Sequence, residues 1–354
     1  MHLNRREWLA GSAALAGLAA TPIHAAETMA ATTPLHLVHP ELRDLVPMVE
    51  QFARAMSPLN RANLEKLRQP NPMFSRPPLD TVPHEMRMIP VGKGHPDVAI
   101  YIVNAKPGTS RPAILHTHGG GYVMGSAESS VRGLQELCVK LDCVAVSVEY
   151  RLAPETTYAA SVEDNYAGLK WLHTNAASIG ADPTRIAVMG ESAGGGHAAL
   201  LAIAARDRGE VPVCYQCLIY PMLDDRTGTT RKVPPHVGTL IWTPEQNYFG
   251  WESLLGAKPG KAKVPKGGVP ARVVDLNGLP PAFIGVGTLD LFHDEDVDYS
   301  QRLNAVGVNT ELIVVPGAFH GFDGISKLRK NKLGDWFEAT KLNALRRGFG
   351  LPTV

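Results

Sequence analysis

From about residue 98 onward, the chain alternates short apolar runs with longer segments of helical period. The apolar runs are continuous rather than alternating, which is typical of strands that a parallel sheet buries on both faces. They occupy residues 98–103, 113–117, 144–149, 186–189, 214–220, 282–286 and 311–315. Helical periodicity marks residues 129–141, 162–176, 193–207, 294–306 and 335–348. This alternation predicts an α/β fold with a mostly parallel, doubly wound sheet.

Two segments do not follow the alternation. Residues 40–83 predict two short amphipathic helices, interrupted at Ser57-Pro58 and followed by a proline-rich connector. Residues 224–270 are too long for a simple crossover and contain a helical stretch near 240–256. Such insertions often act as lids or substrate walls, so we expect both segments to lie together over the sheet as a cap. The catalytic domain would then span residues 84–350, with 224–270 as an insertion.

The first 26 residues have the layout of a bacterial export signal. Arg5 and Arg6 precede a weakly apolar run that ends in small residues near Ala25 and Ala26. An arginine pair followed by an aromatic residue and leucine resembles a twin-arginine signal. We therefore expect cleavage after Ala25 or Ala26 and a periplasmic or secreted protein. An uncleaved basic N-terminal anchor is the alternative.

Composition narrows the class of protein. The chain has 354 residues, of which 44% are hydrophobic, 35 basic and 34 acidic. Basic and acidic residues are interspersed, which excludes the basic stripe typical of nucleic-acid-binding proteins. Beyond the export signal no apolar run reaches the roughly 18 residues of a membrane-spanning helix, so we expect no integral membrane segment in the mature protein. Four cysteines make no disulfide framework, and the sequence leaves open whether Cys138 and Cys143 are bonded.

A candidate nucleophile follows the apolar run at 186–189. Gly190-Glu191-Ser192-Ala193-Gly194 fits G-x-S-x-G, in which small residues let a strand turn sharply into a helix so that the serine oxygen projects alone. The motif stands between a predicted strand and a predicted helix, as that turn requires. An ordinary glycine-rich turn is the alternative. The lysine of a phosphate-binding loop is missing, which excludes that motif.

A serine needs a base to remove its proton and an acid to orient that base. Asp290 and His320 each follow the end of a predicted strand and occur in the order that this fold requires. His236 and His293 compete less well for the base, because the first lies in the insertion and the second in the same loop as Asp290. Other acids crowd the loop at a helix start, where they suit the helix dipole: Asp294, Glu295, Asp296 and Asp298.

A fourth element, His118-Gly119-Gly120-Gly121-Tyr122, follows the predicted strand at 113–117. Esterases use such glycine runs to aim backbone N–H groups at an oxyanion, because glycine allows the closest approach. His116 and His118 suggest metal binding as an alternative, but the acid of an H-x-H-x-D pattern is absent. We assign neither metal nor cofactor.

Together these motifs resemble the hormone-sensitive-lipase-like family of α/β-hydrolase carboxylesterases. The resemblance covers about residues 40–350 and rests on HGGGY, EYRLAPE, ADPTRIAVMGESAGG, DLFHDED and PGAFHGF. It implies an α/β-hydrolase fold with a helical cap and a catalytic triad of Ser192, Asp290 and His320. It also implies that the oxyanion donors are the N–H groups of Gly120, Gly121 and Ala193. This chain departs from the family pattern at Glu191, where Asp is commoner, and at Leu291, where Pro often stands.

The resulting functional hypothesis is a serine carboxylesterase for short- to medium-chain acyl esters, acting through an acyl-enzyme. An exported deacetylase or a lactone or xenobiotic esterase would use the same triad. A non-catalytic ligand-binding protein on this fold is the alternative of a different class. Tyr122, Met124 and Trp242 are candidate pocket residues, although such side chains also pack between cap and core. The expected partner is a small ester, and the sequence leaves open whether the chain forms a homodimer, its natural substrate and its stereoselectivity.

Overall fold

The computed structural model describes residues 33–69 and 76–354, so the predicted export signal and part of the proline-rich connector lie outside the described residues. Within those ranges eight strands form one sheet in the order β1-β2-β4-β3-β5-β6-β7-β8. β2 pairs antiparallel with both β1 and β4, and every pairing from β4 to β8 is parallel. The strands are β1 (His84–Ile89), β2 (Val98–Val103), β3 (Arg111–Thr117), β4 (Val144–Val148), β5 (Ala181–Glu191), β6 (Tyr215–Ile219), β7 (Ala282–Gly287) and β8 (Thr310–Val315).

The predicted mostly parallel sheet is therefore confirmed, and its seven apolar runs are strands. β1 was not expected, and its position explains why. It is an edge strand on which every residue except Ile89 is exposed, so it lacks the apolar run that marks the buried strands.

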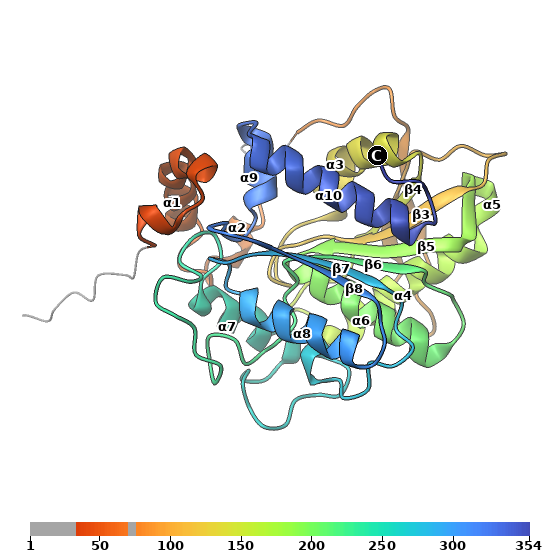
Figure 1. Ribbon diagram of the computed structural model, residues 1–354. Coiled ribbons are helices and arrows are strands. Elements are labelled where there is room, and N and C mark those ends of the chain that lie inside the picture. Colours follow the sequence, from red (N-terminus) through yellow and green to blue (C-terminus); the bar gives the residue numbers. More distant parts are fainter. Residues whose placement is uncertain (1–32, 70–75) are drawn as a thin grey trace, which may run out of the picture. The chain divides into compact units, whose positions relative to one another are not determined.

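Helices cover both faces of the sheet. In Figure 1, α3, α9 and α10 lie on one side, and α4, α6 and α8 lie on the other. The first side shares an apolar cluster that includes Leu134 and Phe337, and the second side shares one that includes Leu169 and Tyr299. The helices are α3 (Ala127–Leu141), α4 (Tyr158–Thr174), α5 (Ala176–Ile179), α6 (Ala193–Arg208), α8 (His293–Ala305), α9 (Phe322–Leu328) and α10 (Lys332–Gly348).

The parallel register brings several loops to one edge of the sheet. Thr117 pairs with Gly190, and Gly287 pairs with Val315, so the segments after β3, β5, β7 and β8 all leave from the same edge. Sites in open parallel sheets form at this carboxyl edge. The four sequence motifs therefore start from neighbouring points.

Parts of the two expected cap segments share a third apolar cluster. Leu59 and Leu64 come from the first segment, and Trp242, Trp251 and Leu254 come from the insertion. The elements are η1 (Leu35–Leu37), η2 (Pro40–Leu45), α1 (Val46–Ala55), α2 (Leu64–Leu67), α7 (Pro244–Leu255) and η3 (Pro270–Arg272). α7 begins with a capping box in which the Thr243 and Gln246 side chains satisfy each other's backbone N–H groups.

Candidate active site

Ser192 lies in a sharp turn between β5 and α6. Its backbone has φ 59° and ψ −125°, a conformation that L-residues rarely adopt. The turn is held by main-chain hydrogen bonds: Ser192 N–H donates to Ile219 O (2.9 Å), and Met222 N–H donates to Ser192 O (2.9 Å). A Cβ atom on Gly194 would lie 2.1 Å from the carbonyl oxygen of Thr117. The glycine of the motif is therefore required by the close approach of β3.

The structure brings Ser192, His320 and Asp290 into one hydrogen-bonded chain. Ser192 Oγ lies 2.9 Å from His320 Nε2, and His320 Nδ1 lies 2.9 Å from Asp290 Oδ2. The second oxygen of Asp290 accepts a hydrogen bond from the N–H of Phe292 (3.0 Å), which fixes the carboxylate. Such a chain lets the imidazole take the serine proton while the carboxylate stabilises the imidazolium.

The competing candidates for acid and base lie elsewhere. His293 pairs with the exposed side chain of Asp294 at 2.7 Å. The backbone oxygen of His236 accepts a hydrogen bond from Thr33. Glu295 is buried, and one of its carboxylate oxygens accepts from the N–H groups of Leu223 and Asp224, which removes it from the triad.

The glycine run after β3 is positioned as an oxyanion loop. Gly120 has φ 124° and Gly121 has φ 60°, both in the left-handed range that favours glycine. A Cβ atom on Gly120 would lie 2.1 Å from Met124 O. Within the described residues, the N–H groups of Gly120, Gly121 and Ala193 make no hydrogen bond to another group. These donors are free to bind a developing negative charge beside Ser192.

A row of packed aromatic and imidazole rings supports this loop. The rings of His118 and Tyr150 stack at 4.1 Å, and the Tyr150 hydroxyl donates to His118 O (2.7 Å). His197 lies between the rings of Tyr150 and Tyr122, at 4.5 and 4.8 Å. Burial lowers the pKa of His118 to about 4 and that of His197 to about 3. Both imidazoles are therefore neutral at pH 7, as their apolar surroundings require.

The three candidate pocket residues lie in the third apolar cluster together with Ala193: Tyr122, Met124 and Trp242. The Tyr122 hydroxyl donates to Met222 O (2.7 Å), and its ring packs 5.1 Å from that of Trp251. Trp242 lies against the oxyanion loop, because a Cβ atom on Gly121 would be 2.1 Å from its Cη2 atom.

Two supporting groups escaped the sequence interpretation. The ring of Tyr220 packs 4.7 Å from that of His320, and the Tyr220 hydroxyl donates to Asp323 (2.7 Å). Next to the nucleophile turn, Glu191 pairs with His116 at 3.0 Å. Burial raises the pKa of Glu191, but the charge and hydrogen bond of His116 together with the charges of Lys341 and Lys327 lower it to about 2. Tyr220, Glu191 and His116 lie at or next to strand ends, which is the signal that could have found these contacts, whereas Asp323 lies in α9.

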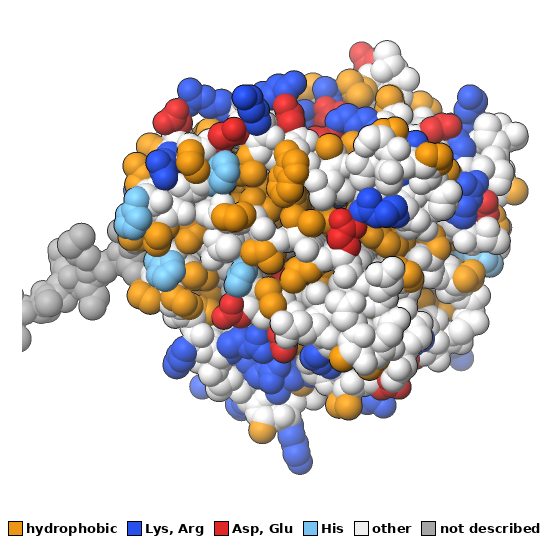
Figure 2. Space-filling view, viewed as in Figure 1, with side chains coloured by type: hydrophobic (Ala, Val, Ile, Leu, Met, Phe, Trp, Pro, Cys, Tyr) orange, Lys and Arg blue, Asp and Glu red, His pale blue; other side chains and the backbone are white. Residues whose placement is uncertain are grey.

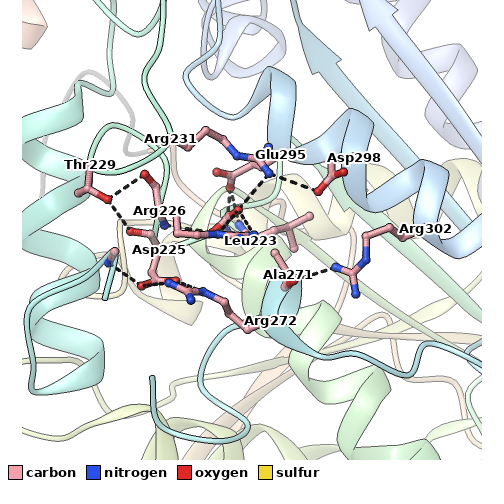
Figure 3. Close-up of polar contacts among 12 residues, drawn as sticks. Leu223, Asp225, Arg226, Thr229, Arg231, Ala271, Arg272, Glu295, Asp298 and Arg302 are labelled. Atoms are coloured by element: carbon pink, nitrogen blue, oxygen red, sulfur yellow. Dashed lines mark hydrogen bonds and ion pairs between the residues drawn. The ribbon is translucent and has the colours of Figure 1, made fainter. Parts of the chain in front are cut away.

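Charged side chains hold the two ends of the insertion to each other and to α8 (Figure 3). Asp225 binds Arg272 through both carboxylate oxygens, at 2.8 and 3.0 Å, and accepts from the N–H of Gly260 (2.7 Å). Arg231 contacts Asp298 of α8 at 3.3 Å. Charged pairs thus help to anchor residues 224–231 and 271–272, in addition to the apolar packing of Ala271.

No helix of the described residues is long and apolar enough to cross a membrane. Within the same residues, no group of three or more His, Cys, Asp or Glu side chains is arranged to hold a metal ion. All four cysteines are free thiols. Figure 2 shows a face on which basic and acidic side chains lie near one another around apolar areas, without an extended field of one sign.

Comparison with known proteins places these features in a family. A family described as having the α/β-hydrolase fold matches residues 114–324, more than half of the chain. Carboxylesterase NlhH of Mycobacterium tuberculosis is 35% identical over 212 residues, which cover 60% of this chain and 66% of that relative. Esterase LipI of the same species is 35% identical over 217 residues, with the same coverage.

The matches to solved structures cover a greater share of this chain. A bacterial heroin esterase is 35% identical with a TM-score of 0.77, and the match covers 89% of this chain and 99% of that one. Esterase LipW of Mycobacterium marinum is 31% identical with a TM-score of 0.71, and the match covers 90% of this chain and 99% of that one. The chain therefore belongs to the hormone-sensitive-lipase-like family of α/β-hydrolase carboxylesterases, as its sequence motifs indicated.

Proposed function

We propose that this protein is a serine carboxylesterase that hydrolyses short- to medium-chain acyl esters through an acyl-enzyme. The observation that carries the proposal is the chain of two 2.9 Å contacts from Ser192 through His320 to Asp290, beside three unpaired N–H groups. A non-catalytic binding protein has no need for a base aligned on the serine hydroxyl. The complete triad beside three unpaired N–H groups therefore favours catalysis over ligand binding.

In the proposed mechanism, His320 Nε2 removes the proton of Ser192 Oγ as that oxygen attacks the ester carbonyl. The N–H groups of Gly120, Gly121 and Ala193 stabilise the oxyanion of the tetrahedral intermediate. The imidazolium then protonates the leaving alcohol, and an acyl-serine remains. The same base then removes a proton from a water molecule, which attacks the acyl group. This step releases the carboxylic acid and regenerates the free serine. Losing one oxyanion donor costs about 2.7–4 kcal/mol of transition-state stabilisation in enzymes of this kind.

Burial of the triad supports a short acyl chain. Ser192 and His320 are only 8% and 5% exposed, so the site as described offers little open space for a long acyl chain. A relative of Pseudomonas putida, 31% identical over 218 residues, is named ethyl acetate hydrolase, which is consistent with short esters. A deacetylase or a lactone or xenobiotic esterase would differ from this proposal only in the alcohol or ring that the site accepts.

We further propose that the protein is exported through a twin-arginine signal and acts in the periplasm or outside the cell. The support is the arginine pair at residues 5 and 6 and the small residues near 25 and 26. Export with cleavage predicts that the mature protein begins at Ala26 or Glu27. N-terminal sequencing of the protein from the native cell envelope tests this.

Hydrolysis of p-nitrophenyl esters from acetate to palmitate, with the wild type and Ser192→Ala, tests the catalytic proposal. We expect the highest kcat/KM with short chains and a loss of at least about 10⁴-fold in the variant, because a triad serine cannot be replaced functionally. Circular dichroism should show that the variant remains folded. Residual activity of more than a few per cent in Ser192→Ala would overturn the nucleophile. A folded wild type without activity on any ester would favour the ligand-binding alternative.

A further inference from the structure

The active site is covered by one short segment of the insertion. We define the strap as residues Gly238 to Trp242. At its start the N–H of Gly238 donates to Leu289 O (3.0 Å), one residue before Asp290. Ile241 then passes His320, because its Cγ2 atom lies 4.0 Å from the Cβ position of Gly321. The strap thus runs from the acid past the base.

The strap ends on the oxyanion loop. The indole of Trp242 occupies the space above Gly121, where a Cβ atom would lie 2.1 Å from Cη2 and 2.7 Å from Cζ2. Trp242 is only 6% exposed, and it shares an apolar cluster with Ala193, whose N–H is one of the proposed oxyanion donors. An ester that reaches Ser192 therefore meets this indole.

The covering conformation is strained at one residue. Trp242 N–H donates to Leu240 O (2.9 Å), which closes a three-residue γ-turn centred on Ile241. Ile241 has φ 69°, and a γ-turn with a positive central φ is rare and strained. A β-branched residue increases that cost, because its side chain crowds the backbone at positive φ. The closed strap is therefore a conformation that opening would relax.

Different contacts hold the strap and the rest of the insertion. In the strap, the Thr239 hydroxyl is hydrogen-bonded to the Thr33 hydroxyl, and Leu240 packs in the apolar cluster that includes Phe337. Before it, Asp225 and Arg231 are fixed by ion pairs to Arg272 and Asp298 (Figure 3). After it, α7 is fixed by its capping box and by the Asn247 side chain, which donates to Thr227 O (2.9 Å). The contacts that hold Trp242 itself are a 3.2 Å hydrogen bond to Asn247 and apolar packing.

We propose that the strap is a movable cover of the active site and that Trp242 sets the largest ester group that this site accepts. The inference rests on the proposed esterase activity and adds its size determinant. Short esters would be accommodated with a small displacement of the indole, whereas longer chains would require the strap to open fully.

Chain-length profiles of Trp242→Ala and Trp242→Phe test the size determinant. The measured quantity is the ratio of kcat/KM for p-nitrophenyl octanoate to that for the acetate. We expect this ratio to rise about tenfold or more in Trp242→Ala, because pocket size changes of this kind shift discrimination by one to two orders of magnitude. The ratio for Trp242→Phe should lie between those of the wild type and Trp242→Ala. Trp242→Phe also tests the size determinant if the alanine variant does not fold.

Leu254→Ala is the matched control, because Leu254 lies in the same apolar cluster on a later turn of α7. It should destabilise the cap yet leave the ratio within about twofold of the wild type, since packing loss alone does not enlarge the site. An unchanged ratio in folded Trp242 variants that still hydrolyse acetate would overturn the size determinant while leaving the esterase proposal intact. An inactive wild type would instead count against the esterase proposal.

Hydrogen exchange tests the movement. Amides of the strap should exchange faster than those of α7 in the free protein and should slow after a phosphonate ester has modified Ser192. Equal protection of the strap and α7 in the free protein would overturn the movable cover.

Discussion

The floor of the active site and its cap are held by different forces. On the floor, backbone groups meet directly: Ser192 bonds to Ile219 and Met222, and Gly194 lies where only a hydrogen fits beside Thr117. In the cap, side chains hold the insertion, through ion pairs such as Asp225–Arg272 and through the apolar packing of Trp242 and Leu254. Backbone contacts allow few residue types, so the floor leaves sharp sequence motifs. Side-chain pairs can be replaced by other pairs, so the cap leaves only an irregular interval.

The difference predicts that changes on the floor reduce activity and that changes in the cap reduce stability. Asp290→Asn should have the largest effect, a fall in kcat of about 10⁴-fold, because the amide stabilises the wrong tautomer of His320. The N–H of Phe292 retains an oxygen acceptor in this variant, so the melting temperature should change little. Steady-state hydrolysis of p-nitrophenyl acetate and a thermal melt measure both.

The control for that variant is Asp294→Asn, in the same loop but paired with His293 and exposed. Its kcat should stay within about twofold of the wild type, as for most surface substitutions. The reverse result, with Asp294 essential and Asp290 dispensable, would reassign the acid.

In the cap, Asp225→Ala should lower the free energy of unfolding by about 3 kcal/mol, because it leaves the partly buried Arg272 without its carboxylate. Urea denaturation measures the loss. Asp207→Ala removes a pair with Arg206 in which the carboxylate is 59% exposed, and it should cost less than about 1 kcal/mol. Equal losses in both variants would show that the buried pair does not anchor the insertion.

An effect that appears only at low pH concerns the junction of floor and cap, where His197 packs against Tyr122. Its folded-state pKa of about 3 lies below the value near 6.5 of an unfolded histidine. Between those values the unfolded chain binds more protons, so stability falls as the pH is lowered, by about 1.4 kcal/mol per pH unit for this group. His197→Phe should reduce the slope of stability against pH between 6.5 and 4, as urea midpoints would show. An unchanged slope would contradict the pKa assignment.

The sequence predicts more of the floor than of the cap. The seven apolar strands and the order Ser192, Asp290, His320 could be predicted because the sheet and the G-x-S-x-G turn impose residue types locally. β1 could not, because an exposed edge strand needs no apolar run. Tyr220 was missed because its contact with His320 joins residues a hundred positions apart.

The sequence by itself determined the fold class, the family and the candidate nucleophile, since each depends on patterns within one strand, turn or helix. Only the tertiary structure showed that the predicted acid and base form one hydrogen-bonded chain with Ser192, because a loop with several carboxylates gives no local signal of which one points at the base. It alone revealed that Trp242 lies on Gly121 and that Ile241 is strained above the site. Those contacts depend on how a long insertion folds back over the sheet, and no short-range pattern encodes that path.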